Sequence, residues 1–260
     1  MHPLGEKYLR KSALPTIFCA GCGDGIVLNA MIRVLDKKGG TGSFAFVSGI
    51  GCSSWIPVMI NADVLHTLHG RAIAVATGLK LAMPDKNIVV FTGDGDCIGI
   101  GGNHLIHAAR RNIDITVVMI NNYIYGMTGG QTSPSTPAGS RTKTAPYGNN
   151  EYPFNAVDLV VGAGGSFAAR ETAATPRRLE KTLAQALEHK GFSFVEIMAQ
   201  CPTQAGRNIF GNGTPEFVFT ELRRRAIQKP DVPLEKGQFR VGILHRNTEK
   251  TAYSPVRLLQ

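Results

Sequence analysis

The chain has 260 residues, of which 43% are hydrophobic and 18% are charged, enough for a sizeable core in one large α/β domain or two small ones. It contains no apolar run near the roughly 18 residues that a membrane span requires and no apolar signal core at its N-terminus, so we expect a cytoplasmic protein without a membrane partner. The net charge is +9, but the basic residues are dispersed, which favours solvated helix ends or a face for an acidic protein partner over nucleic-acid binding.

The first motif along the chain is FCAGCGDG, in which Cys19 and Cys22 form a Cys-x-x-Cys pair. Such a pair can bind a metal, exchange disulfides or fill a small turn. The chain has five cysteines in total, and no export signal is expected. This odd number argues against a disulfide framework and favours metal or cluster ligands.

Apolar runs of strand length alternate with segments of helical periodicity. We expect strands at residues 43–48, 114–122 and 192–198, and another over 87–96 that runs into a glycine turn. We expect helices from about residue 70 to Pro84, at 103–111 and at about 176–190. Continuous apolar strands separated by helices predict an α/β fold, a parallel sheet with helices on both faces.

Two stretches depart from this alternation. Residues 132–153 are rich in Pro, Ser, Thr and Gly and are too long for an ordinary connection, so we expect a functional or partner-contacting loop. From about Gln228 the chain becomes a polar tail. We therefore expect one domain at residues 1–227, and a tail at 228–260 that packs on the domain or on a partner subunit.

The stretch TGDGDCIGIGGNH, from Thr92 to His104, lies where an expected parallel strand ends and a helix begins. Ligands bind at this edge of α/β sheets, and glycines let the backbone approach phosphate oxygens. Asp94 would repel a phosphate unless Mg²⁺ lay between them. A second oxygen ligand is available at Asn121-Asn122, because a strand–helix–strand crossover of about this length returns the chain to the same edge.

The GDG sequence followed by Asn-Asn resembles the signature of thiamine diphosphate enzymes. In that family the aspartate, the asparagine and a backbone carbonyl two residues later hold Mg²⁺, and the resemblance places these ligands at Asp94, Asn122 and Ile124. It also implies the diphosphate-binding type of α/β fold. A glycine turn beside a surface asparagine pair is the alternative.

Two further cysteines follow expected strands. Cys52 lies in GIGCSSW and Cys201 in AQCPT, so both should reach the same edge of the sheet as Asp94. Together with the Cys-x-x-Cys pair they would form a four-thiolate site for Zn²⁺ or a 4Fe–4S cluster. Beside thiamine diphosphate a redox cluster is the more useful occupant.

Several motifs make the resemblance more specific. CAGCGDG, GIGCSSW, HTLHGRA, IGGNH, IYGMTGGQ and QCPT look like the β subunit of 2-oxoacid:ferredoxin oxidoreductases, over roughly residues 18–207. HGRA and IGGNH most resemble the 2-oxoglutarate type. Pyruvate and branched-chain 2-oxoacid types remain as alternatives.

The resemblance implies specific ligands and contacts. One 4Fe–4S cluster would bind Cys19, Cys22, Cys52 and Cys201, with Cys97 outside the ligand set. His69 would be catalytic. Contacts to thiamine diphosphate are expected from Asp24, Ile50, Gly51, Cys52, Ser53, His69, Gly93, Gly95, Asp96, Gly126 and Met127.

The implied activity is the coenzyme A-dependent oxidative decarboxylation of a 2-oxoacid, such as 2-oxoglutarate to succinyl-CoA. Electrons would pass through the cluster to ferredoxin. No glutamate here has a convincing setting for the cofactor's aminopyrimidine, so the resemblance implies an α subunit that supplies the pyrimidine-binding domain. A non-oxidative thiamine enzyme with structural zinc, or a non-catalytic subunit, remains possible from the residues alone.

Overall fold

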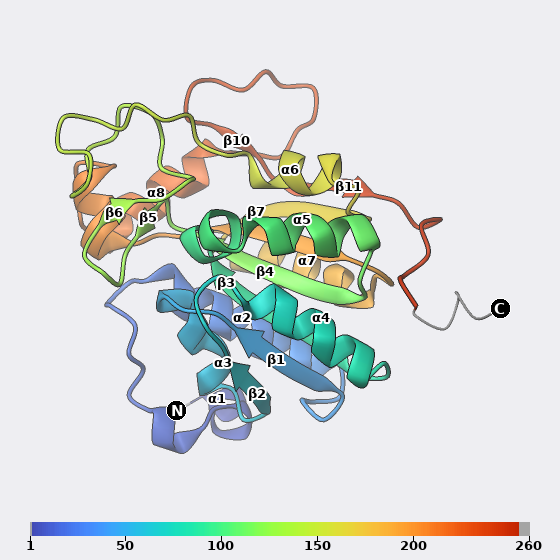
Figure 1. Cartoon of the computed structure of the whole chain (residues 1–260). Helices are drawn as coiled ribbons and strands as arrows, with labels where there is room; N and C mark the ends of the chain where they lie inside the picture. The colour runs from blue at the N-terminus through green and yellow to red at the C-terminus, as the bar shows by residue number, and fades with distance from the viewer. Residues whose placement is uncertain (1, 255–260) are drawn as a thin grey trace.

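A central seven-stranded sheet organises the computed structural model, which describes residues 2–254 (Figure 1). The strand order is β11-β7-β8-β4-β3-β1-β2, and all neighbours are parallel except β11, which pairs antiparallel with β7. The strands are β1 (Phe44–Ser48), β2 (Asp63–His66), β3 (Asn87–Gly93), β4 (Ile115–Asn121), β7 (Phe167–Thr172), β8 (Ser193–Met198) and β11 (Gly242–Arg246). Two short pairs lie outside it, β5 (Ile124–Tyr125) with β6 (Gln131–Thr132) and β9 (Ala226–Ile227) with β10 (Phe239–Arg240).

Helices cover both faces of this sheet, as the sequence predicts (Figure 1). One face packs against α1 (Pro3–Tyr8), α2 (Gly23–Lys37), α3 (Trp55–Met59) and α7 (Pro176–Glu188). The other packs against α4 (Ala72–Ala82), α5 (Gly102–Arg111) and α6 (Ala156–Gly162). The remaining helix is α8 (Pro215–Arg225), and the short helical segments are η1 (Lys11–Ala13), η2 (Cys52–Ser54), η3 (Gly95–Ile100) and η4 (Pro202–Gly206).

The central strands are largely apolar because both of their faces are buried. Successive side chains point to opposite faces. Phe46 and Phe91 therefore join the core beneath α2, whereas Val47 and Val90 join the core beneath α4. This double burial explains why the central strands read as continuous apolar runs in the sequence.

The order of the strands fixes where a ligand can bind. From β1 the chain passes outward to β2, and it then crosses back to β3 on the other side of β1. The carboxyl ends of β1 and β3 therefore lie at a topological switch point, where crossovers on the two sides diverge and leave a crevice. The glycine turns after Ser48 and after Thr92 meet there.

The expected tail, residues 228–260, contributes to the main body. Its β10 pairs with β9, and its β11 forms the last strand of the sheet beside β7. Residues 255–260 of that expectation lie outside the described residues. Within residues 2–254, no helix has the length and apolar character needed to cross a bilayer.

Candidate functional site

The switch point contains a cavity of about 80 Å³. All residues that the sequence analysis assigns to the cofactor or to magnesium line it. These are Asp24, Ile50, Gly51, Cys52, Ser53, His69, Gly93, Asp94, Gly95, Asp96, Asn122, Ile124, Gly126 and Met127. They come from five separate segments, which the parallel topology brings to one edge of the sheet.

Asp94, at the end of β3, is a buried carboxylate without a cationic partner among residues 2–254. Its Oδ2 accepts a hydrogen bond from Ser133 Oγ at 2.5 Å and another from Ser135 Oγ. Burial raises the pKa of Asp94 to about 6, although the two hydroxyls oppose that shift. A buried negative charge is costly unless a cation or several donors compensate it, so this carboxylate suits a metal ion.

The two asparagines after β4 have different roles. Asn121 points into the structure, where its Nδ2 donates to Glu196 Oε1 at 2.8 Å. Asn122 lines the cavity, and its Oδ1 accepts from the backbone N–H of Ile124 at 3.1 Å. Tyr123 between them has a φ of +68°, a conformation uncommon for a residue with a side chain. This tight turn puts Asn122 and Ile124 on the same wall as Asp94.

A second cavity of about 320 Å³ lies beside the first. All four cysteines of the expected ligand set line it, namely Cys19, Cys22, Cys52 and Cys201. The two cavities share walls, formed by Asp24, Cys52, Asn122, Gly126 and Met127. A Cβ atom placed on Gly126 would lie 3.6 Å from Cys201 Sγ and 3.9 Å from Cys52 Sγ, so both thiols face this glycine.

Burial disfavours the ionisation of three of these thiols, those of Cys22, Cys52 and Cys201. Burial raises the pKa of Cys52 to about 12, and the nearby Asp24 and Cys201 add to the shift. Burial also raises the pKa of Cys201 and places that of Cys22 well above the ordinary thiol range. Among the described residues, no lysine or arginine lines either cavity. Thiolates here therefore need positive charge from a bound metal.

The four thiols surround a space rather than a single point. In the described part of the chain, no three His, Cys, Asp or Glu side chains gather closely enough for one metal ion. An iron–sulfur cluster is larger than one ion and takes its thiolate ligands from farther apart. Of the three expected magnesium ligands, only Asp94 has a side chain of one of these four types, since the other two are the Asn122 amide and the Ile124 carbonyl.

Asp24 lies in the first turn of α2 and lines both cavities. It is buried, and burial raises its pKa to about 6. Cys22 Sγ donates to its Oδ2 over 3.4 Å. The shared wall thus carries an acidic side chain directly beside a thiol.

Cys97 lies apart from these ligands. It is 1% exposed and packs in the core beneath α4 and α5, and it lines neither cavity. The structure thus separates it from the four cysteines that share a cavity.

Three residues at the site are not predicted from the sequence. Ser133 and Ser135 reach Asp94 from the loop that follows β6, and Tyr125 lines the first cavity, with its hydroxyl donating to the Gly95 carbonyl at 3.2 Å. The Pro-, Ser- and Thr-rich composition marks residues 132–153 as a functional loop. Nothing in that composition singles out which serines turn inward.

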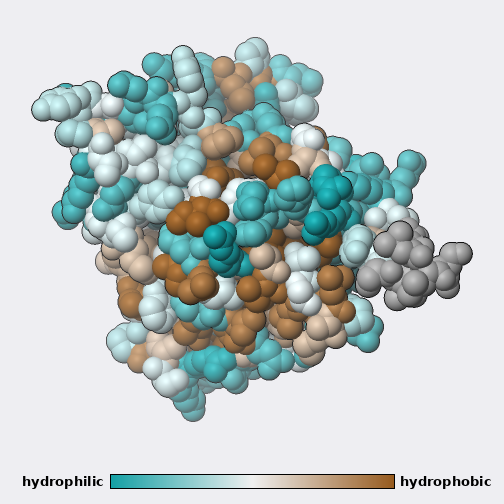
Figure 2. All heavy atoms as spheres, viewed as in Figure 1, coloured by the Kyte–Doolittle hydropathy of each residue, from teal (hydrophilic) through white to brown (hydrophobic). Residues whose placement is uncertain are grey.

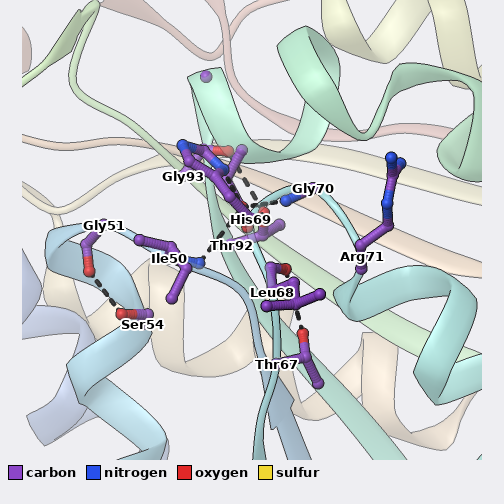
Figure 3. Close-up of polar contacts among 12 residues, drawn as sticks. Ile50, Gly51, Ser54, Thr67, Leu68, His69, Gly70, Arg71, Thr92 and Gly93 are labelled. Carbon is purple, nitrogen blue, oxygen red and sulfur yellow. Dashed lines mark hydrogen bonds and ion pairs between the residues drawn. The ribbon is translucent and has the colours of Figure 1, made fainter.

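A hydrogen-bonded junction forms the wall that carries His69. Figure 3 shows Ile50, His69, Gly70 and Thr92 converging from three separate segments. Their shared partner is the carboxylate of Asp96, which is 3% exposed. The side chain of His69 is 33% exposed and borders the first cavity.

Comparisons with known proteins find similar sequences and a similar structure. Residues 49–197 match the family model described as thiamine pyrophosphate enzyme, C-terminal TPP binding domain. The chain is 59% identical over 241 residues to the 2-oxoglutarate synthase subunit KorB of Methanothermobacter marburgensis, covering 91% of this chain and 85% of that relative. It is 51% identical to the KorB subunit of Methanocaldococcus jannaschii, covering 96% of this chain and 98% of that relative.

A solved structure is also similar over nearly the whole chain. It is the 2-oxoglutarate:ferredoxin oxidoreductase from Magnetococcus marinus with 2-oxoglutarate, coenzyme A and succinyl-CoA bound. Its TM-score to this chain is 0.87 at 34% sequence identity, and the match covers 98% of this chain and 89% of that one. The similarity therefore extends beyond the thiamine-binding segment to the cysteine-bearing ends of the chain.

Proposed function

Because the chain belongs to the thiamine diphosphate enzymes and, within them, to the β subunits of 2-oxoacid:ferredoxin oxidoreductases, we propose that it binds thiamine diphosphate, Mg²⁺ and one 4Fe–4S cluster in a 2-oxoglutarate:ferredoxin oxidoreductase. The proposed reaction converts 2-oxoglutarate and coenzyme A to succinyl-CoA and CO₂, with electrons passing to ferredoxin. The observation that carries this proposal is the shared wall between the two cavities, because a cluster can take electrons only from a cofactor close to it.

The residues of the first cavity fit a magnesium-bound diphosphate. Asp94, the Asn122 side chain and the Ile124 carbonyl offer oxygen ligands. Mg²⁺ would offset the negative charge of Asp94, which has no cationic partner among residues 2–254. Within the described part of the chain, Ser53 Oγ is buried on this wall without a hydrogen-bond partner, as expected of a group that awaits a ligand. When bound, thiamine diphosphate supplies the electron sink for decarboxylation.

The four cysteines that line the second cavity fit a cluster that carries positive iron. Burial raises the pKa of Cys22, Cys52 and Cys201, and bound iron would lower those pKa values and favour the thiolates. A four-cysteine set can also hold zinc, but zinc fits this site less well, because among the described residues no three of these side chains gather closely enough for a single ion. Zinc would make this a non-oxidative subunit.

The site of this chain requires a partner to be complete. The first cavity holds about 80 Å³, less than the roughly 300–1,000 Å³ of pockets that enclose a ligand. Among residues 2–254, no glutamate lines either cavity, so in this proposal an α subunit supplies the glutamate for the aminopyrimidine. Leu68, 76% exposed beside His69, and Ile100, next to Gly70, add apolar surface close to His69. Figure 2 shows further apolar side chains across the middle of the face viewed in Figure 1. Such a surface favours a protein partner.

A substrate comparison tests the proposal. The complex of this chain with its α subunit should reduce ferredoxin with 2-oxoglutarate and coenzyme A faster than with pyruvate or 2-oxoisovalerate. A faster rate with pyruvate or 2-oxoisovalerate would move the assignment to those types. Failure to reduce ferredoxin with any 2-oxoacid, despite bound thiamine diphosphate, would overturn the oxidoreductase proposal.

The loop serines provide a prediction about the metal site. Replacing both Ser133 and Ser135 with alanine should weaken Mg²⁺ binding by about 10- to 100-fold, because groups that orient a ligand contribute on that scale. Calorimetry of Mg²⁺ binding in the presence of thiamine diphosphate measures the change. Ser140→Ala, in the same loop but lining neither cavity, serves as the control and should leave the affinity unchanged.

A further inference from the structure

The hydrogen bonds of Asp96 define the protonation pattern of His69. One carboxylate oxygen, Oδ1, lies 2.6 Å from His69 Nδ1 and also accepts from the backbone N–H of Gly70 at 2.7 Å and, at 3.3 Å, from that of Ile50. The other oxygen, Oδ2, accepts from the Thr92 hydroxyl at 2.5 Å. The Gly70 and Ile50 N–H groups and the Thr92 hydroxyl all donate to Asp96. The nitrogen of His69 can be a donor or an acceptor, depending on which ring nitrogen carries the proton.

An ionised carboxylate can only accept hydrogen bonds. His69 Nδ1 must therefore carry the proton in the bond to Asp96, and in the neutral ring the other nitrogen, Nε2, then carries a lone pair. His69 lines the first cavity, where it meets the edge of Tyr125 with ring centroids 6.2 Å apart. The described residues provide no hydrogen-bond partner for Nε2.

The local backbone is shaped around this carboxylate. A Cβ atom on Gly49 would lie 2.0 Å from Asp96 Oδ2, so glycine is needed for Asp96 to enter the junction. Gly70 has a φ of +72°, in the left-handed region that favours glycine, and its N–H is the one that Asp96 accepts. Two glycines on separate segments thus permit the same buried contact.

From this geometry the structure assigns Asp96 as a positioning residue that fixes His69 in the Nδ1–H form and leaves Nε2 as a proton acceptor in the cavity. The inference rests on the proposed function for its reaction and adds the role of this pair. The matching ligand group is one that carries a dissociable proton, such as a hydroxyl, an amine or a thiol. Its bond to hydrogen breaks with the electron pair left on the ligand, an N–H bond forms at Nε2, and the Asp96 carboxylate offsets the charge of the resulting imidazolium.

A double-mutant cycle separates this role from simple structural support. In the complex with the α subunit, His69→Gln and Asp96→Ala should each lower kcat by about 100-fold or more. The double variant should be no slower than either single variant, because both remove one function. Asp96→Asn should recover only part of the rate, because its amide oxygen can still accept from His69 Nδ1 but the neutral amide cannot offset the imidazolium charge. Independent losses that multiply in the double variant would overturn the assignment.

A second measurement tests the tautomer without relying on activity. Ring nitrogen spectra of ¹⁵N-histidine-labelled complex, compared with the His69→Gln complex, isolate this one of seven histidines. We expect a neutral ring protonated at Nδ1. A ring protonated at Nε2 would contradict the inference even if Asp96→Ala failed to fold. This result is independent of ferredoxin reduction, so it distinguishes failure of the inference from failure of the proposed function.

Discussion

Replacing Asp94 with alanine is expected to abolish the Mg²⁺-dependent binding of thiamine diphosphate while the iron content stays unchanged. The physical reason is that Asp94 is the only carboxylate of the proposed magnesium set, and no lysine or arginine lines either cavity among the described residues to take over the diphosphate charge. A directly bound ligand should contribute more than the groups that orient it, so we expect a loss of affinity of about 100-fold or more. Isothermal calorimetry with and without Mg²⁺ measures this loss.

Asp85→Ala is the matched control for this variant. Asp85 is exposed and lies just before β3, at the opposite end of the strand from Asp94. Its replacement should leave the affinity for thiamine diphosphate unchanged. An Asp94→Ala protein that binds the cofactor as tightly as the original would remove Asp94 from the proposed site.

Replacing Cys201 with alanine is expected to remove most of the iron and the visible absorbance of the cluster. Cys201 and Cys52 face the same glycine across the second cavity, so three remaining thiols would leave one iron of the cluster exposed to solvent. Iron analysis of anaerobically purified protein measures this effect. The thiamine site should survive, because Cys201 does not line the first cavity.

Cys97→Ala provides the internal comparison, since Cys97 is buried in the core and lines neither cavity. Its iron content should match that of the original chain. A Cys201→Ala protein with full iron, or a Cys97→Ala protein without iron, would show that the cluster ligands are assigned incorrectly. Zinc in place of iron in the original protein would support the non-oxidative alternative.

The sequence predicts the sheet well where its strands are buried on both faces. β3, β4 and β8 read as continuous apolar runs, and each agrees with an expected strand within a few residues. The edge strand β2 was missed, because three of its four residues are exposed and its sequence lacks the apolar run. Helix α2 is not predicted either, because it begins with Gly23-Asp24-Gly25 and glycine is unfavourable in helices.

The motifs of the candidate site are predictable because parallel topology brings all strand carboxyl ends to one edge. That rule places Asp94, Asn122, Cys52 and Cys201 together without any knowledge of side-chain positions. It does not specify which member of the Asn121-Asn122 pair faces the ligand, and that is decided by the turn at Tyr123. Nor does it find Ser133 and Ser135, since their approach depends on how a long irregular loop folds back over β3.

The contact between His69 and Asp96 is likewise not predictable from the sequence. HGRA at the start of a helix suggests a cofactor contact at His69, and Asp96 follows the GDG motif closely enough to suggest another. Only the folded chain reveals that the two side chains bond to each other at 2.6 Å, with Gly49 and Gly70 making room for the contact. Contacts between distant segments of this kind carry no local sequence signal.

The central claim is that adjacent cavities in this chain hold thiamine diphosphate and a 4Fe–4S cluster. The most direct test is to measure thiamine diphosphate, iron and zinc in one anaerobically purified sample of the complex. The proposal predicts one thiamine diphosphate and about four irons for each copy of this chain, apart from any iron that its partners carry. Zinc instead of iron, or a complex that contains iron but binds no thiamine diphosphate, would contradict it.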